Sequence, residues 1–277
     1  MNSFDSENLN INSETSTRSA EASDDAKTAQ IQFDVLTLFP EIISNYVNSS
    51  MMKKAQDRDL ISCKIHDIRK FAIDEYGHVD DTLYGGGRGM LMRAEPLYQA
   101  LKSAEDSSRS KRLNIFLSPK GKVFDQDMAK EFSTYDQIIL ICGHYEGVDQ
   151  RFIDECVDLE VSIGDFVISG GELGALTIID ASSRMLTGFL ADAEAMQDES
   201  HYHGLLESRQ YTKPRSWLNR EVPEVLFSGN HKLIAEFKYY DALNETLTKR
   251  PDLFQKLDLS DEDLEGLANF RKNNNIE

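Results

Sequence analysis

The sequence predicts an α/β protein built on a parallel sheet, and three observations support that class. Residues 137–142 form a continuous aliphatic run, which is typical of a strand buried on both faces. Strand-like and helix-like segments alternate along the chain from residue 31 to residue 188. Two glycine-bearing passages, 143–147 and 162–172, follow the aliphatic run. Because α/β proteins bind ligands at the carboxyl ends of parallel strands, these passages predict a small-molecule pocket.

The elements before and after residue 93 follow from local patterns. Residues 31–38 and 60–68 alternate like strands, and Pro40 favours a helix whose apolar face extends to Met51. Residues 69–93 predict an irregular loop that is too long and too charged to be a hairpin. The later elements expected are a helix at 96–105, a strand at 113–118, a helix at 125–132, the strand at 137–142 and a helix at 173–188.

The alternation ends beyond Gly188. Residues 191–204 are small and polar and predict a mobile linker. No further buried strand is expected from residue 205 onward. Residues 231–250 predict a long amphipathic helix, and Ser260 opens a capping box for a final helix. The expected organisation is therefore an α/β domain at 31–190 and a small all-helical domain at 205–277.

The first 30 residues differ from the rest of the chain. They contain six acidic and two basic residues and almost no large apolar side chains. Such a segment buries too little apolar surface to offset the entropy of ordering, so a disordered acidic leader is expected.

Composition limits the classes of function. The formal net charge of −18 argues against a nucleic-acid binder, but only the contact face of such a protein must be basic. Residues 200–250 carry eight basic and six acidic residues, which leaves room there for an anionic partner. The scattered cysteines Cys63, Cys142 and Cys156 predict reduced thiols in a cytoplasmic protein. His201 and His203 lack a third ligand, so no metal site is expected, and no apolar run is long enough for a membrane span.

Several motifs occur in a fixed order, and their combination is more specific than any one of them. They are LFPE at 38–41, VDDTLYGGGRGM at 79–90, LSP at 117–119, CGHYEG at 142–147, SIGDFVISGGE at 162–172 and LFSGNH at 226–231. With them, residues 31–270 closely resemble the bacterial tRNA (guanine-N1-)-methyltransferase family. The resemblance implies the SPOUT fold, in which an α/β domain contains a deep trefoil knot, with a helical tRNA-binding domain after it. It also implies a homodimer.

The resemblance further implies a reaction and a set of site residues. Members of the family transfer a methyl group from S-adenosylmethionine to N1 of the guanosine 3′ of the anticodon, tRNA position 37, aided by Mg²⁺. The family pattern assigns cofactor binding to Leu117, Ser118, Gly143, Tyr145, Glu146, Ile163, Gly164, Asp165, Phe166, Val167, Ile168 and Gly171. Arg184 matches the arginine that engages the target guanine, and a structural ion pair is its alternative role.

The reaction also needs a base. N1 of neutral guanine carries a proton, so a carboxylate within hydrogen-bond reach is expected to remove it. Glu199 stands at the family's aspartate position in the linker, and Asp198 precedes it. Either the linker backbone accommodates the longer Glu199 side chain, or Asp198 serves as the base. We favour Glu199, because Ser200 and Gly204 keep the family spacing around it.

Two other functions remain open at this point. One is an RNA-binding module that has lost catalysis through the change in the linker. The other is a nicotinamide-dependent oxidoreductase, for which the sequence lacks both the glycine fingerprint between strand and helix and the acidic ribose ligand.

Overall fold

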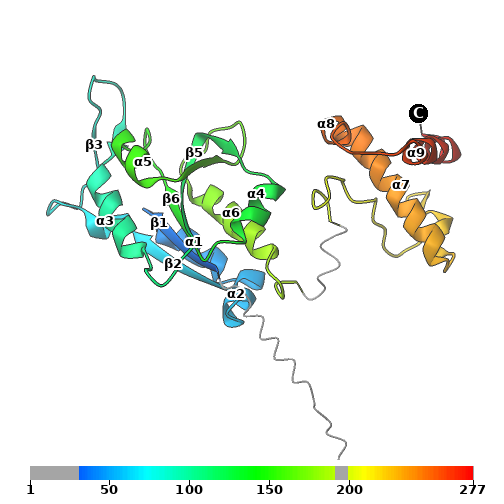
Figure 1. Ribbon diagram of the computed structural model, residues 1–277, viewed down its shortest axis with the longest axis horizontal. Coiled ribbons are helices and arrows are strands. Elements are labelled where there is room, and N and C mark those ends of the chain that lie inside the picture. Colours follow the sequence, from blue (N-terminus) through cyan, green and yellow to red (C-terminus); the bar gives the residue numbers. More distant parts are fainter. Residues whose placement is uncertain (1–30, 191–198, 277) are drawn as a thin grey trace, which may run out of the picture.

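The computed structural model describes residues 31–190 and 199–276, and its centre is a five-stranded sheet (Figure 1). All neighbouring strands are parallel and follow the order β2-β1-β6-β5-β7. The strands are β1 (Ile31–Thr37), β2 (Ile61–Asp67), β5 (Arg112–Val123), β6 (Gln137–Cys142) and β7 (Leu159–Ser162). The predicted α/β class with a parallel sheet is confirmed. The predicted leader and Asp198 lie outside the described residues.

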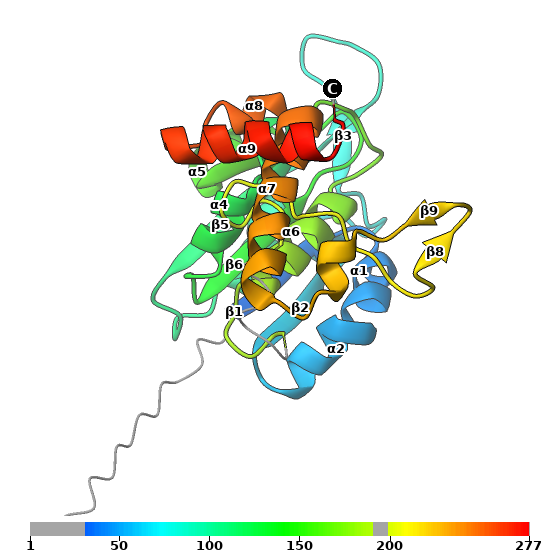
Figure 2. The same cartoon turned by 90° about the vertical axis from the view of Figure 1, so that its right-hand side faces the viewer.

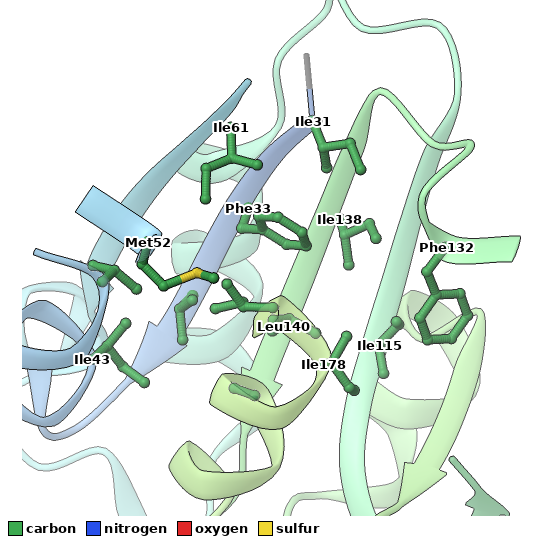
Figure 3. Close-up of a cluster of buried hydrophobic side chains, with 14 of the residues drawn as sticks. Ile31, Phe33, Ile43, Met52, Ile61, Ile115, Phe132, Ile138, Leu140 and Ile178 are labelled. Carbon is green, nitrogen blue, oxygen red and sulfur yellow. The ribbon is translucent and has the colours of Figure 1, made fainter. Parts of the chain in front are cut away.

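Helices cover both faces of the sheet, because successive strand residues point to opposite sides and both sides are apolar. One face packs against α1 (Pro40–Val47), α2 (Ser50–Asp57), α4 (Gln126–Phe132) and α6 (Glu172–Arg184). Its buried cluster includes Phe33 and Ile138, shown in Figure 3. The other face packs against α3 (Ala94–Ala104), α5 (Gln150–Cys156) and the short helix η1 (Ile68–Phe71). Every residue of β6 is fully buried, as its aliphatic run predicted.

The structure corrects the prediction for residues 69–93. Within that stretch, β3 (Asp80–Thr82) and β4 (Met90–Met92) form an antiparallel hairpin, so the expectation that no hairpin could form there was wrong. Its long loop contains four glycines with positive φ, at 85, 86, 87 and 89. Glycine adopts this left-handed conformation without steric cost, which lets a long loop close a short ladder.

Two other boundaries differ from the prediction. The helix expected from Pro40 through Met51 is divided into α1 and α2, because Asn48 and Ser49 donate side-chain hydrogen bonds to carbonyls of the preceding turn (2.9 and 2.8 Å). Strand β7 was not anticipated. It is only four residues long and merges with the glycine passage that follows it, so it has no periodicity of its own.

Three helices follow the described end of the linker, α7 (His231–Lys249), α8 (Pro251–Phe254) and α9 (Asp261–Asn273), and α7 packs against the other two. The predicted capping box at Ser260 is present, with Asp263 as its second member. Before α7 lie η2 (Glu224–Phe227) and two short strands, β8 (Ser216–Trp217) and β9 (Arg220–Glu221). Both strands are exposed, so the expectation of no further buried strand is confirmed. Within 31–190 and 199–276, no helix has the length and apolarity needed to cross a bilayer.

Strand β5 has a bulge beside β7 near its end. Leu117 and Lys122 both pair with Val161, so the four intervening residues bulge out of the ladder. Gly121 lies in this bulge directly on the β7 backbone. A Cβ at Gly121 would lie 2.4 Å from the carbonyl carbon of Glu160 and from the Val161 nitrogen.

We therefore expect Gly121→Ala to destabilise the protein by about 2 kcal/mol or more, because the added methyl group meets backbone atoms that cannot rotate away. The free energy of unfolding from urea titration tests this, with exposed Lys120→Ala as the neighbouring control. Equal stability of the two variants would show that β5 and β7 are not packed this closely.

Candidate active site

A cavity of about 280 Å³ opens at the carboxyl ends of β5, β6 and β7. Its walls come from the turn after β6, the passage after β7 and the first turn of α6. The residues predicted for the cofactor that line it are Leu117, Ser118, Gly143, Tyr145, Glu146, Ile163, Gly164, Phe166, Val167, Ile168 and Gly171. Asp165 is exposed and is not part of the lining. The two glycine passages thus enclose a pocket where the sequence predicted one.

Bare backbone forms much of this pocket's wall. The Gly171 nitrogen donates to the Gly143 carbonyl (3.1 Å), which joins the two glycine passages directly. A Cβ at Gly171 would lie 2.7 Å from the Cys142 Cα, and one at Gly143 would lie 2.8 Å from the Phe116 ring. Tyr145 adopts a left-handed backbone conformation (φ 58°) at the pocket, which is unusual for a residue with a Cβ. Side chains larger than hydrogen are therefore excluded from the points where the two passages touch.

A buried carboxylate lies beside the pocket, next to the lining residues His144 and Gly171. Glu172 is 3% exposed, and it accepts hydrogen bonds from the Thr37 hydroxyl (2.6 Å) and contacts His144 Nε2 (2.8 Å). Burial by itself favours the neutral acid, but the hydrogen bonds from His144 and Thr37 outweigh it and lower the pKa of Glu172 below its usual value. Burial, assisted by the nearby Glu172 charge, raises the pKa of the Cys142 thiol, so this cysteine stays protonated and unreactive. One carboxylate thus ties the ends of β1 and β6 to the start of α6.

Strand β4 borders the pocket on the side of Glu146. The Glu146 nitrogen donates to the Met90 carbonyl (3.0 Å), and the Met92 nitrogen donates to the Gly147 carbonyl (2.9 Å). A Cβ at Gly89 would lie 2.4 Å from Glu146 Oε1, so the glycine-rich loop stands against this carboxylate. Sequence reasoning did not connect the loop to the pocket, because the two are more than 50 residues apart and joined mainly by backbone bonds.

The structure also brings the predicted guanine-binding arginine and the predicted base together. Arg184 Nη2 donates to both carboxylate oxygens of Glu199 at 2.6 Å, and both side chains are partly exposed. Nearby, Lys130 donates to the Tyr202 carbonyl (2.6 Å) and lies over the Tyr202 ring. The described end of the linker is thereby fastened to α4 and α6. Arg184 does have an ion pair, so the alternative structural role is compatible with the geometry too.

The pocket's chemistry restricts its ligand. No lysine or arginine is among the described residues that line it, and most of its walls are apolar side chains or peptide groups. A ligand that carries a pyrophosphate would lack cationic partners there, whereas a neutral or cationic ligand would not need them. In the described part of the chain, no group of three or more His, Cys, Asp or Glu side chains is arranged to hold a metal ion.

Comparison with known proteins identifies the family. A model of the tRNA (Guanine-1)-methyltransferase TrmD family matches residues 31–256. Proteins described as tRNA (guanine-N(1)-)-methyltransferase from Treponema denticola and Ruminiclostridium cellulolyticum are 49% and 45% identical to this chain. Each alignment covers 82% of the chain, and 91% and 97% of the relatives. A protein of the same description from Dictyoglomus turgidum is 43% identical over 87% of the chain and 97% of its own length. This chain belongs to the tRNA (guanine-1)-methyltransferase family.

Proposed function

We propose that this protein transfers a methyl group from S-adenosylmethionine to N1 of the guanosine at tRNA position 37, immediately 3′ of the anticodon. The pocket between the two glycine passages carries this proposal, because it is walled by backbone, contains a carboxylate and offers no cation for a phosphate. The family membership supplies the substrate class. A nicotinamide-dependent oxidoreductase is disfavoured by the family membership and by the missing glycine fingerprint between strand and helix.

The residues of the pocket fit S-adenosylmethionine on physical grounds. Gly143 and Gly171 leave bare backbone in the pocket wall, which lets a flat adenine ring approach closely, and Leu117, Ile163 and Ile168 offer apolar surface to its faces. Glu146 places a negative charge near the pocket that can balance a sulfonium. When bound, the cofactor supplies an electrophilic methyl group.

The path of the chain supports a trefoil knot of the SPOUT type. Residues 160–162 lie against the bulge formed by residues 118–121, because Leu117 and Lys122 both pair with Val161, and we infer that the chain threads through this region. The chain then continues to Gly171, which lies against the end of β6. We propose that this threading closes the knot around the pocket. Sequence patterns cannot predict such a path, since almost all chains avoid it.

The residues of the chain divide the chemical work. Glu199 is proposed to remove the proton from N1 of guanine, and Arg184 to hold the guanine through its acceptor edge. In the structure these two side chains occupy each other's hydrogen-bonding groups. Proton transfer to Glu199 is expected to loosen this pair, because a carboxylate that takes up a proton loses its attraction to the guanidinium. Their positioning of the two reactants is the largest contribution that binding can make to such a transfer.

A homodimer is proposed because one chain does not bring all these parts together. The pocket lies at the start of α6, whereas Arg184 is twelve residues further along the helix, roughly 18 Å away at 1.5 Å per residue. Exposed apolar side chains surround the pocket end of α1 and α6, including Ile42 (41%), Leu173 (57%) and Val167 (86%). A second copy covering this surface would bury them and would place its own Glu199 at the pocket.

The remaining assignments follow from the same observations. We propose that residues 205–277 form the tRNA-binding domain, in which the exposed Arg209 pairs with the buried Asp241. We place the protein in the cytoplasm, consistent with its free cysteines. The proposed help from Mg²⁺ would rely on RNA phosphates and water, because the described residues offer no group of metal ligands. A catalytically inactive RNA-binding module is the second candidate, and the Glu199 experiment below separates the two.

The cofactor assignment can be tested at Gly143. We expect Gly143→Val to weaken S-adenosylmethionine binding at least about tenfold, because its Cβ alone would press on the Phe116 ring and its methyl groups would enter the pocket. Calorimetric titration measures the affinity. A thermal melt accompanies it, since the Phe116 contact can also lower stability. Unchanged affinity in a folded variant would contradict the placement of the pocket.

The base can be tested by single-turnover methylation of unmodified tRNA. Glu199→Gln is expected to reduce the rate on the order of a hundredfold while cofactor affinity stays the same. Glu207→Gln, an exposed carboxylate in the same stretch, is the matched control and should be mild. A larger loss in Asp198→Asn would transfer the role to Asp198. Full activity in both Glu199→Gln and Asp198→Asn would show that neither linker carboxylate is the base.

Sharing of the site between subunits predicts complementation. Gly143→Val and Glu199→Gln chains are each expected to be inactive alone, but their mixed dimer contains one site with an intact pocket and an intact base. Random mixing at equal amounts should restore about a quarter of wild-type activity. Absence of any recovery, with mixed dimers demonstrated by tagged purification, would confine each site to one chain.

A further inference from the structure

The hairpin formed by β8 and β9 has no role in the chemistry proposed above. Trp217 pairs with Arg220 across this hairpin, and Leu218 and Asn219 form its two-residue turn, both with positive φ (49° and 59°). This is the conformation of a type I′ turn, which matches the twist of an antiparallel pair. Figure 2 shows β8 and β9 standing away from α7. The tip is therefore a defined shape that presents its side chains outward.

The tip carries large apolar side chains that lack cover. Trp217 is 66% exposed and Leu218 is 73% exposed. Exposure of a tryptophan on a projecting turn is unusual, because its large apolar surface is normally buried. Trp217 is also the only tryptophan in the whole sequence.

Cationic side chains flank the tryptophan. Lys213, Arg215 and Arg220 form no ion pair with any residue in the described part of the chain. The Arg215 guanidinium lies over the Phe227 ring, 4.2 Å from its centroid, which fixes the base of the hairpin to η2. By contrast, Arg209 is held by the buried Asp241 carboxylate and cannot serve a ligand without breaking that pair.

We propose that this hairpin is a stacking platform for an unpaired nucleotide of the tRNA, with Trp217 against the base and Arg215 and Arg220 beside the flanking phosphates. An exposed aromatic ring between unpaired cations is the combination that binds single-stranded nucleic acid. A protein partner would not require three free cations on a chain whose net charge is −18. The inference rests on the proposed function, since it assigns a new contact to the same substrate.

The single tryptophan provides a direct test. Full-length protein is titrated with an anticodon stem-loop that contains the target guanosine, and with a fully paired RNA of similar length. Stacking should quench Trp217 fluorescence in a saturable way with the stem-loop and leave it nearly unchanged with the paired RNA. If filter retention detects binding of the stem-loop but Trp217 fluorescence does not change, the stacking platform is wrong and the proposed function still stands.

Variants provide the second arm. Trp217→Ala should weaken tRNA binding about 5- to 150-fold, Trp217→Phe should retain most of the affinity, and S-adenosylmethionine affinity should not change. Ile73→Ala, which truncates an exposed apolar residue outside the proposed tRNA-binding domain, is the matched control. Wild-type tRNA affinity of the Trp217→Ala variant would overturn the inference. A change in the sedimentation of the free variant would also overturn it, because Trp217 would then belong to a protein interface. A wild-type protein that neither binds nor methylates tRNA would overturn the proposed function together with it.

Discussion

The structure depends on backbone approaching backbone where the strands end. Gly171 lies against the Cα of Cys142, and Gly121 lies against the peptide between Glu160 and Val161. Each contact would be broken by a single Cβ. They hold the bulge of β5, the end of β6 and the start of α6 close together, and the pocket is the space left between them. Packing of side chains alone would hold these three segments several ångströms farther apart.

The buried Glu172 makes this arrangement a unit with the rest of the sheet. A carboxylate that is 3% exposed is costly unless its oxygens are hydrogen-bonded, and both Thr37 and His144 are needed to satisfy it. The three residues belong to β1, the turn after β6 and α6, which are far apart in sequence. A shift of any of these elements would leave the charge without partners. Hydrogen bonds to one buried charge therefore fix the elements that carry the pocket, while the pocket's walls are fixed by the absence of side chains.

The sequence predicted what is local and missed what depends on distant pairing. The aliphatic run of β6, the capping box at Ser260 and the two glycine passages each have a signal within a few residues, and the structure contains all of them. The hairpin of β3 and β4 was missed because its ladder has only three residue pairs, with three residues on each side of a seven-residue loop. The sequence predicted separate roles for Arg184 and Glu199 but not the contact between them. Nothing in the linker's composition specifies which side chain Glu199 contacts.

The overall acidity of the chain is compatible with an anionic substrate because charge acts locally at this range. Beyond about 10 Å at moderate salt, exposed charges are largely screened, so a distant acid does little to repel a phosphate. The number of basic residues alone also overstates the positive charge that is available to a ligand. Arg209 and Lys249 are bound to Asp241 and Glu245 and add little to the field outside. Lys213, Arg215 and Arg220 form no ion pair with a described residue and lie on or beside the hairpin that carries Trp217, which places positive charge next to an exposed aromatic face.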